Sequence, residues 1–127
     1  MIKDQMQRER ATDLGVVRIS NEAIATISAV AALEVRGVHR MGGGLKSTIY
    51  EALFSRSTYK GIRIRMRDSE VKLTASIIAE YGADIPRVAD EVQENIKRAV
   101  EKMAGLVLSE VDVIVEGVHA SGSSDKK

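Results

Sequence analysis

Arginine at every second position of residues 63–67 is the most distinctive chemical feature of this sequence, and Lys72 follows shortly after. Side chains two residues apart on a β-strand project from the same face, so Arg63, Arg65 and Arg67 would lie side by side. Guanidinium groups in such a row can bind phosphates, lipid head groups or an acidic protein surface. We call these three residues and Lys72 the arginine comb, and we predict it as the candidate partner-binding surface.

Two other interpretations of the arginine comb remain open. Charge runs are most often simply solvated, and the comb would then be the wet face of an edge hairpin, paired across the sheet with Glu80, Asp112 and Glu116. The other interpretation is a small RNA-binding module that uses a basic sheet face. Nucleic-acid binding is disfavoured because only 3% of the residues are aromatic, and none lies inside the comb where bases could stack.

Catalytic and metal-binding chemistry have little support in the sequence. His39 and His119 are the only histidines, they fall in separate elements, and no cysteine or carboxylate cluster lies near either at metal-ligand spacing. We expect both to be surface or edge residues. Lys46 and Ser47 follow a triple glycine but lack the preceding spacing of a phosphate-binding P-loop. We therefore predict no catalytic residue, no metal ligand, no cofactor and no enzymatic activity.

The composition is that of one small domain. The chain has 127 residues, 44% of them hydrophobic, which suffices for the core of one domain but hardly of two. The net charge of +1 gives no bulk attraction to nucleic acid or anionic membranes, and the absence of cysteine excludes disulfides. Because no stretch reaches the ~18–20 apolar residues of a membrane span and no signal peptide is visible, we expect a cytoplasmic protein.

Residues 84–105 predict the main helix. Their apolar residues recur at spacings of three, four and seven, which places them on one stripe. Asp84 is a suitable N-cap, Pro86 falls in the first turn, and Gly105 ends the helix. One face is apolar and the other charged, so this helix requires a partner layer.

The strands supply that layer. Residues 61–67 alternate between apolar residues and arginines, and residues 71–81 continue the alternation after a turn, so the two form a hairpin with one buried face. Tyr81, at the end of the hairpin, is expected to close the hydrophobic core. Residues 107–117 predict a last strand with a bulge near Ser109, and this strand can return parallel to the second hairpin strand.

The N-terminal half adds a strand at residues 15–19 and a helix at 21–36. The apolar stripe of this helix is wide, which suggests burial on two sides. Residues 37–41 predict a brief extended segment that ends at the triple glycine, and residues 45–56 predict a short helix.

Together these elements predict an α+β fold, a two-layer sandwich in which two main helices pack on one face of a small mixed β-sheet. We place a single domain at residues 14–118. The polar, charged residues 1–13 are expected to be disordered or loosely helical, and residues 119–127 to be disordered.

The sequence resembles the alkaline shock protein family of bacteria, also called envelope stress response proteins. The resemblance spans residues 14–118. It rests on several short runs: Glu80-Tyr81-Gly82, Ile85-Pro86, Val88-Ala89, Val92-Gln93, Gly105-Leu106, the alternating valines 111–115, and residues 31–38 before a Met-Gly-Gly loop. Members often carry threonine in place of Ala104 and asparagine in place of Asp112, and neither difference touches known chemistry.

The resemblance implies a small, non-enzymatic, cytoplasmic protein that supports cell-envelope homeostasis. Some relatives self-associate and are held near the membrane by a membrane-spanning partner. Our hypothesis is therefore a self-associating scaffold, a homo-oligomer that contacts a membrane-anchored protein without inserting into the membrane itself. Assembly would use the apolar stripe of the first helix or an open sheet edge, with the arginine comb as a second contact surface.

Overall fold

The computed structural model describes residues 9–43, 58–59, 61–67 and 70–120. In chain order its elements are β1 (Glu9–Thr12), β2 (Gly15–Arg18), α2 (Asn21–Leu33), β3 (Val38–Met41), β4 (Thr58–Tyr59), β5 (Ile62–Arg67), β6 (Glu70–Glu80), α4 (Ile85–Ala104) and β7 (Leu108–His119). The short helix predicted at residues 45–56 lies outside the described residues, as do residues 1–8 and 121–127 of the two predicted tails.

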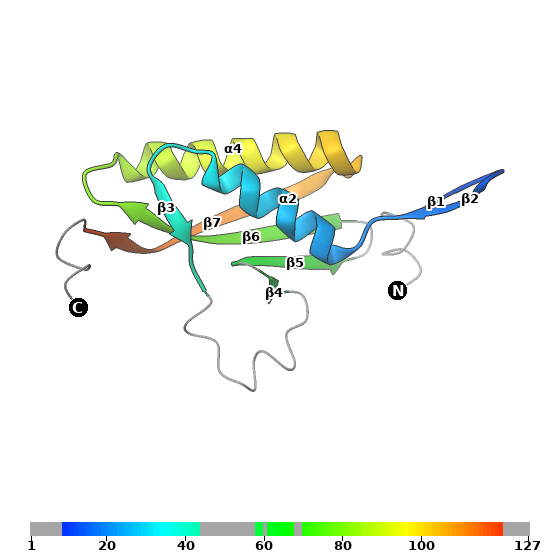
Figure 1. The fold of residues 1–127 in the computed structure, drawn as a ribbon, viewed down its shortest axis with the longest axis horizontal. Coiled ribbons are helices and arrows are strands. Elements are labelled where there is room, and N and C mark those ends of the chain that lie inside the picture. The colour runs from blue at the N-terminus through cyan, green and yellow to red at the C-terminus, as the bar shows by residue number, and fades with distance from the viewer. Residues whose placement is uncertain (1–8, 44–57, 60, 68–69, 121–127) are drawn as a thin grey trace, which may run out of the picture.

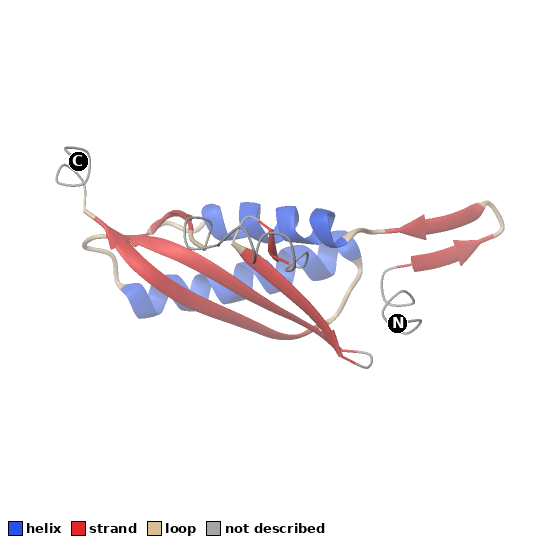
Figure 2. Ribbon diagram, turned by 90° about the horizontal axis from the view of Figure 1, so that it is seen from below, coloured by secondary structure: helices blue, strands red, loops and turns tan. Residues whose placement is uncertain are grey.

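Five strands form the main sheet, and both helices lie over the same face of it (Figure 1). β6 is central: β7 pairs along one edge, while β3 and β5 pair with successive parts of the other edge, and β4 extends the sheet beyond β5. Among the described residues no helix covers the opposite face, which Figure 2 shows from below. The predicted α+β two-layer sandwich is confirmed.

Alternation along β6 divides its side chains between the two faces of the sheet. Toward the helices project its fully buried residues Val71, Leu73, Ala75, Ile77 and Ala79. Positions 72, 74, 76, 78 and 80 are half-buried and project from the other side, which we call the open face. A period of two on the central strand therefore separates the hydrophobic core from the surface where function can lie.

α4 begins and ends at the predicted residues. Asp84 accepts a hydrogen bond from the backbone N–H of Arg87 at 3.4 Å, and Gly105 takes a left-handed φ of 72° after the last turn. The buried stripe of the helix consists of Val88, Val92, Ile96 and Val100, all with no exposed surface. The helix therefore serves mainly to cover the sheet.

α2 is buried on two sides, as its wide apolar stripe predicts. The Ser20 hydroxyl accepts a hydrogen bond from the backbone N–H of Ala23 at 3.1 Å and caps the helix. The helix packs against α4 and also contacts β3, β5 and β6. Of its apolar residues, Val30 and Leu33 remain about half exposed. Most of the stripe that could have mediated assembly is thus covered within the chain.

β7 runs parallel to β6, as the predicted crossover requires. The pairing passes from Val71 opposite Leu108 to Lys72 opposite Glu110, so Ser109 is the extra residue of the predicted bulge. A second irregularity, between Ile77 and Ile78, was not apparent from the sequence.

The N-terminal segment differs from its prediction. Residues 9–12, expected to be disordered or loosely helical, form β1 and pair antiparallel with β2. The resulting hairpin is separate from the main sheet and projects beyond it (Figure 1). Backbone pairing and a turn in which Thr12 Oγ1 accepts from the N–H of Leu14 hold this hairpin, while Leu14 itself is 99% exposed. Hydrophobic patterning could not reveal such an element, because the hairpin buries almost no apolar surface.

Tyr81 is also placed differently from its prediction. β6 ends at Glu80, and the Tyr81 side chain, which follows in the turn, is 78% exposed. The core is closed at this end by Ala79 instead.

A polar clamp joins the end of α4 to the start of β7. Lys97 Nζ donates to Glu101 Oε2 at 2.6 Å and to the carbonyl oxygen of Leu108 at 3.2 Å. The backbone N–H of Leu108 donates to the same Glu101 oxygen at 3.0 Å. The hydrogen bond from Lys97, and then that from Leu108, lower the pKa of Glu101 below its ordinary value of 4.5.

We expect Glu101→Gln to destabilise the fold at neutral pH but not in acid. A carboxyl group whose pKa is lowered by folding contributes stability above its unfolded pKa, and that contribution disappears as the pH falls through the folded pKa. Denaturant unfolding of the wild-type protein and the variant, from about pH 7 to about pH 3, should show a stability gap that closes in acid. Glu94→Gln, exposed on the same helix, is the matched control; an equal gap at every pH would contradict the role of the carboxylate.

Candidate functional site

The arginine comb lies on the open face, as predicted. Arg63, Arg65 and Arg67 are exposed on β5, where they stand opposite Thr74, Lys72 and Glu70 of β6. Arg65 and Lys72 are thus like charges directly across the sheet, an arrangement that costs free energy unless an anion or an acidic surface lies nearby. The comb is a compact basic strip along one side of the open face.

An acidic strip lies on the other side of β6. Glu110 and Asp112 of β7 are exposed and stand opposite Lys72 and Thr74. Lys72 Nζ lies 3.8 Å from Glu110 Oε2, a loose ion pair across the two strands. The open face therefore carries positive charge on β5 and negative charge on β7, with β6 between them.

Two of the three acidic partners that the sequence offered for a solvated comb, Glu80 and Glu116, are engaged elsewhere. Glu80 contacts His39, and Glu116 Oε1 accepts a hydrogen bond from the backbone N–H of Gly43 at 2.9 Å. Both carboxylates lie toward the other end of the sheet from the comb, because Ile62, at the start of β5, already stands opposite Ala75. The register of the strands, which the sequence does not specify, decides this separation.

The two histidines come together, contrary to their expected separation. His39 and His119 lie on β3 and β7, on either side of Glu80 at the end of β6. Their imidazole rings stack with centroids 3.7 Å apart and planes 2° from parallel. Nδ1 of His39 lies 3.0 Å from Oε2 of Glu80, and Nδ1 of His119 lies 3.6 Å from Oε1. We call these three residues the histidine cluster.

Backbone hydrogen bonds hold the histidine cluster in place. The N–H of Glu80 donates to the carbonyl oxygen of Gly37 at 2.8 Å, and the N–H of Tyr81 donates to that of His119 at 2.9 Å. The hydrogen bond from His39 is the largest cause that lowers the pKa of Glu80, partial burial opposes it, and His119 adds a smaller lowering. The two imidazole rings therefore favour the ionised form of the Glu80 carboxyl group.

One sequence signal could have located the histidine cluster. Glu80 lies next to the end of the predicted second hairpin strand, and the predicted parallel strand stops at residue 117, two residues before His119. β7 instead continues to His119, which stands opposite Glu80, so a prediction that extended this strand by two residues would have placed the two side by side. The position of His39 beside Glu80 could not be predicted, because β3 is short and its pairing with β6 contains a register shift at that residue.

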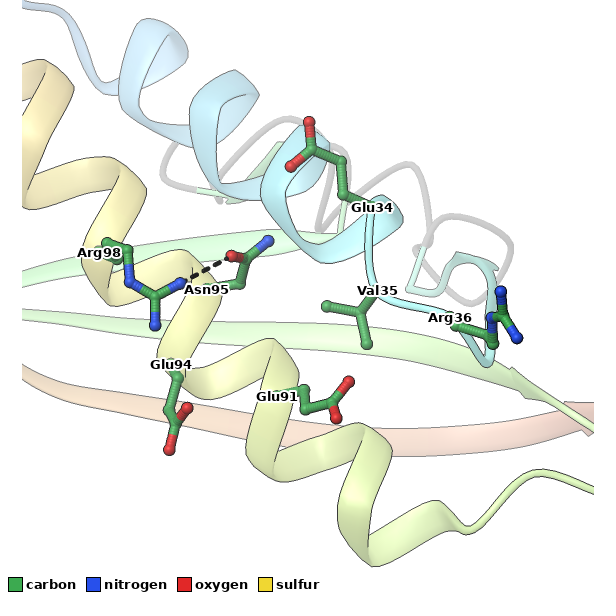
Figure 3. Close-up of a pocket in the computed structure, with 7 residues that line it drawn as sticks. All are labelled: Glu34, Val35, Arg36, Glu91, Glu94, Asn95 and Arg98. Carbon is green, nitrogen blue, oxygen red and sulfur yellow. Dashed lines mark hydrogen bonds between the residues drawn. The ribbon is translucent and has the colours of Figure 1, made fainter.

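A shallow depression of about 290 Å³ lies on the helical side, between the end of α2 and α4. Its lining is mostly charged and comprises Glu34, Val35, Arg36, Glu91, Glu94, Asn95 and Arg98. Figure 3 shows Glu34 and Glu94 pointing to opposite sides. The guanidinium of Arg98 donates a hydrogen bond to Oδ1 of Asn95 at 3.3 Å. The charged groups do not converge on a common point, so the depression offers no constellation for acid, base or nucleophilic chemistry.

No helix of the described residues is both long and apolar enough to cross a lipid bilayer. α4, the longest, carries at least one charged residue in every turn.

The fold and its open face define a class of protein: a small two-layer α+β domain with one helical face and one charged, uncovered sheet face. Residues 9–120 match the alkaline shock protein 23 family, described by its cell envelope-related function, and the chain belongs to this family. The resemblance predicted from the sequence is thus confirmed, and the match extends slightly beyond residues 14–118 at both ends.

Individual relatives agree with this assignment. YqhY of Bacillus subtilis is 32% identical over 108 residues, which cover 85% of this chain and 80% of the relative. A Streptococcus pyogenes homologue of the stress response regulator gls24 is 24% identical over 80% of this chain and 57% of its own length. Among solved structures, the zinc form of a C-terminal domain variant of MamM is 18% identical, with a TM-score of 0.47 over 76% of this chain and 84% of that domain. The last similarity is too low to support an argument about function.

Proposed function

We propose that this protein is a non-enzymatic scaffold of the envelope stress response, which self-associates and contacts a protein partner near the cytoplasmic side of the membrane. Membership of a family with a cell envelope-related function and similarity to a stress response regulator support the setting. The observation that carries the mechanism is the charge pattern of the open face, where a basic strip on β5 and an acidic strip on β7 flank β6.

Such a face is complementary to a second copy of itself. A twofold axis parallel to β6 turns the face of one copy onto that of another and places each β5 over the partner's β7. Each arginine comb then meets Glu110 and Asp112 of the partner, while an axis perpendicular to the strands would oppose comb to comb. Charge complementarity therefore favours the dimer whose axis is parallel to β6 and disfavours the dimer whose axis is perpendicular to the strands.

The middle of the open face supplies apolar contact for this assembly. Ile114 of β7 is 48% exposed and stands opposite Ser76, and Ile78 follows on β6. Apolar residues inside a charged border are the arrangement found in stable protein interfaces. The outer edge of β7 is a second possible contact, because within the described strands β7 pairs with β6 alone.

Reversing the charge of either strip should abolish assembly, and mixing the two reversed proteins should restore it. The first variant replaces Arg63, Arg65 and Arg67 with Glu, and the second replaces Glu110 and Asp112 with Lys. Each alone presents like charges to its own copy, whereas the mixture presents opposite charges. Sedimentation velocity at several concentrations measures the association, and raising the salt from about 50 mM to about 500 mM should weaken it.

The control for the charge-swap experiment reverses two exposed arginines on the helical side, Arg36 and Arg98. This double variant should assemble as the wild-type protein does. A wild-type protein that stays monomeric at every concentration would contradict the scaffold, and assembly that survives both strip reversals would place the interface elsewhere. The RNA-binding alternative predicts a different result: salt-dependent RNA affinity that the comb variant loses and the Glu110 and Asp112 variant gains.

A further inference from the structure

The histidine cluster is the one concentration of metal-ligating side chains found in the part of the chain that the structure describes. His39 and His119 are the only histidines of the sequence, yet strands from opposite halves of the chain bring both to one carboxylate. Neither the charge pattern of the open face nor the packing of the core requires this convergence. The comb and the acidic strip lie farther along the sheet, and the cluster lies outside the buried core.

We propose that His39, Glu80 and His119 bind a divalent transition-metal cation, for which Zn²⁺ is the best chemical fit. Two imidazole nitrogens and one carboxylate oxygen are a common three-ligand set for zinc, with water completing a tetrahedron. Ca²⁺ and Mg²⁺ are disfavoured, because these ions prefer six or more oxygen ligands. The site goes beyond the scaffold function and does not depend on it.

The distances within the cluster suit a single cation. One ligand atom from each of the three residues lies within 4.8 Å of the others. Bonds of about 2.0–2.2 Å from a tetrahedral zinc ion place neighbouring ligand atoms roughly 3.3–3.5 Å apart. Nδ1 of His39 lies 3.0 Å from Oε2 of Glu80 and Nδ1 of His119 lies 3.6 Å from Oε1, both close to this spacing. A cation would turn the two rings out of their parallel stack, so that both nitrogens point at it.

One buried nitrogen of the cluster is also available for a further bond. Nδ1 of His119 is inaccessible to solvent and has no hydrogen-bond partner in the described structure, because Glu80 lies just beyond hydrogen-bond distance. Leaving a buried polar atom unsatisfied costs free energy, and a bound cation would remove that cost. The side chains of His119 and His39 are 20% and 30% exposed, and that of Glu80 is 43% exposed, so a hydrated ion can reach the cluster from the open face.

The test uses the full chain without a histidine tag, titrated with Zn²⁺ alone at about pH 7.5 by calorimetry. We expect one zinc ion per chain, and at least an approximately tenfold loss of affinity in each of His39→Ala, His119→Ala and Glu80→Gln. Glu94→Gln, which changes an exposed carboxylate on the helical side away from both histidines, is the matched control and should bind zinc as the wild-type protein does. Circular dichroism without metal confirms that each variant is folded.

A second measurement follows the histidines directly. Because the chain has two histidines, its imidazole proton NMR spectrum contains two sets of signals, and both should shift together up to one equivalent of zinc. The proposal is overturned if zinc binds without saturation, if only one histidine responds, or if His119→Ala binds zinc unchanged. Assembly of the charge-swap variants is measured independently of zinc binding, so a negative result for the zinc site does not contradict the scaffold, and the reverse also holds.

Discussion

Replacing Ile77 with alanine should lower the free energy of unfolding by about 2–5 kcal/mol. Ile77 lies on β6, the strand with which β3, β5 and β7 all pair, and its side chain has no exposed surface. Truncation removes three methyl or methylene groups from contact with the helical layer and leaves a cavity that rigid neighbours cannot fill. Equilibrium unfolding in urea, with the slope held in common between variants, measures the loss.

Ile114→Ala is the control for the loss at Ile77. It is the same substitution on the adjacent strand, but Ile114 projects from the open face and is 48% exposed. We expect a loss below about 1 kcal/mol in the monomer, mainly from weaker β-propensity. Equal losses at the two positions would mean that the helices do not cover the face of β6 that carries Ile77.

Gly37→Ala should lower the free energy of unfolding by almost as much, although the native glycine has no side chain whose contacts could be lost. Gly37 adopts a φ of 107°, which residues with a side chain rarely adopt, and a β-carbon there would lie 2.5 Å from Cγ2 of Val88. The backbone strain costs about 1–3 kcal/mol, and the overlap with the first turns of α4 adds about 1–3 kcal/mol more. Thermal and urea unfolding measure the sum.

Two further variants separate these two costs. Gly82 has a φ of 96° but no atom within 4 Å of an added β-carbon, so Gly82→Ala should show the strain without the overlap. In the Gly37→Ala background, Val88→Ala removes the colliding methyl group, and the double variant should lose less stability than the sum of the two single changes. Simple additivity would show that α4 moves aside at little cost.

Gly37 also contributes a backbone hydrogen bond to the histidine cluster. Its carbonyl oxygen accepts from the N–H of Glu80, which positions the carboxylate of the histidine cluster. Gly37→Ala is therefore expected to disturb the cluster as well as the packing of α4. A substitution at this one loop residue is thus expected to affect both the helical layer and the sheet.

Much of the fold could be predicted because local patterns dominate it. Alternation in residues 61–67 and 71–81 predicts the hairpin of β5 and β6, and the cap, proline and glycine signals give α4 nearly to the residue. The bulge at Ser109 followed from the mismatched phase of the valines in β7. The β1–β2 hairpin and the exposed Tyr81 did not follow, because neither depends on apolar periodicity.

The candidate sites divide in the same way. The exposure of Arg63, Arg65 and Arg67 follows from a period of two along a single strand, so local sequence determines it. The acidic strip beside the comb, and the meeting of His39, Glu80 and His119, depend on which strands are neighbours and in which register they pair. The sequence by itself thus determined both main helices, the strands β5, β6 and β7, the buried face and the family. Only the tertiary structure decided which charges and imidazoles stand together, because strand order and register are set by contacts between residues far apart in the chain.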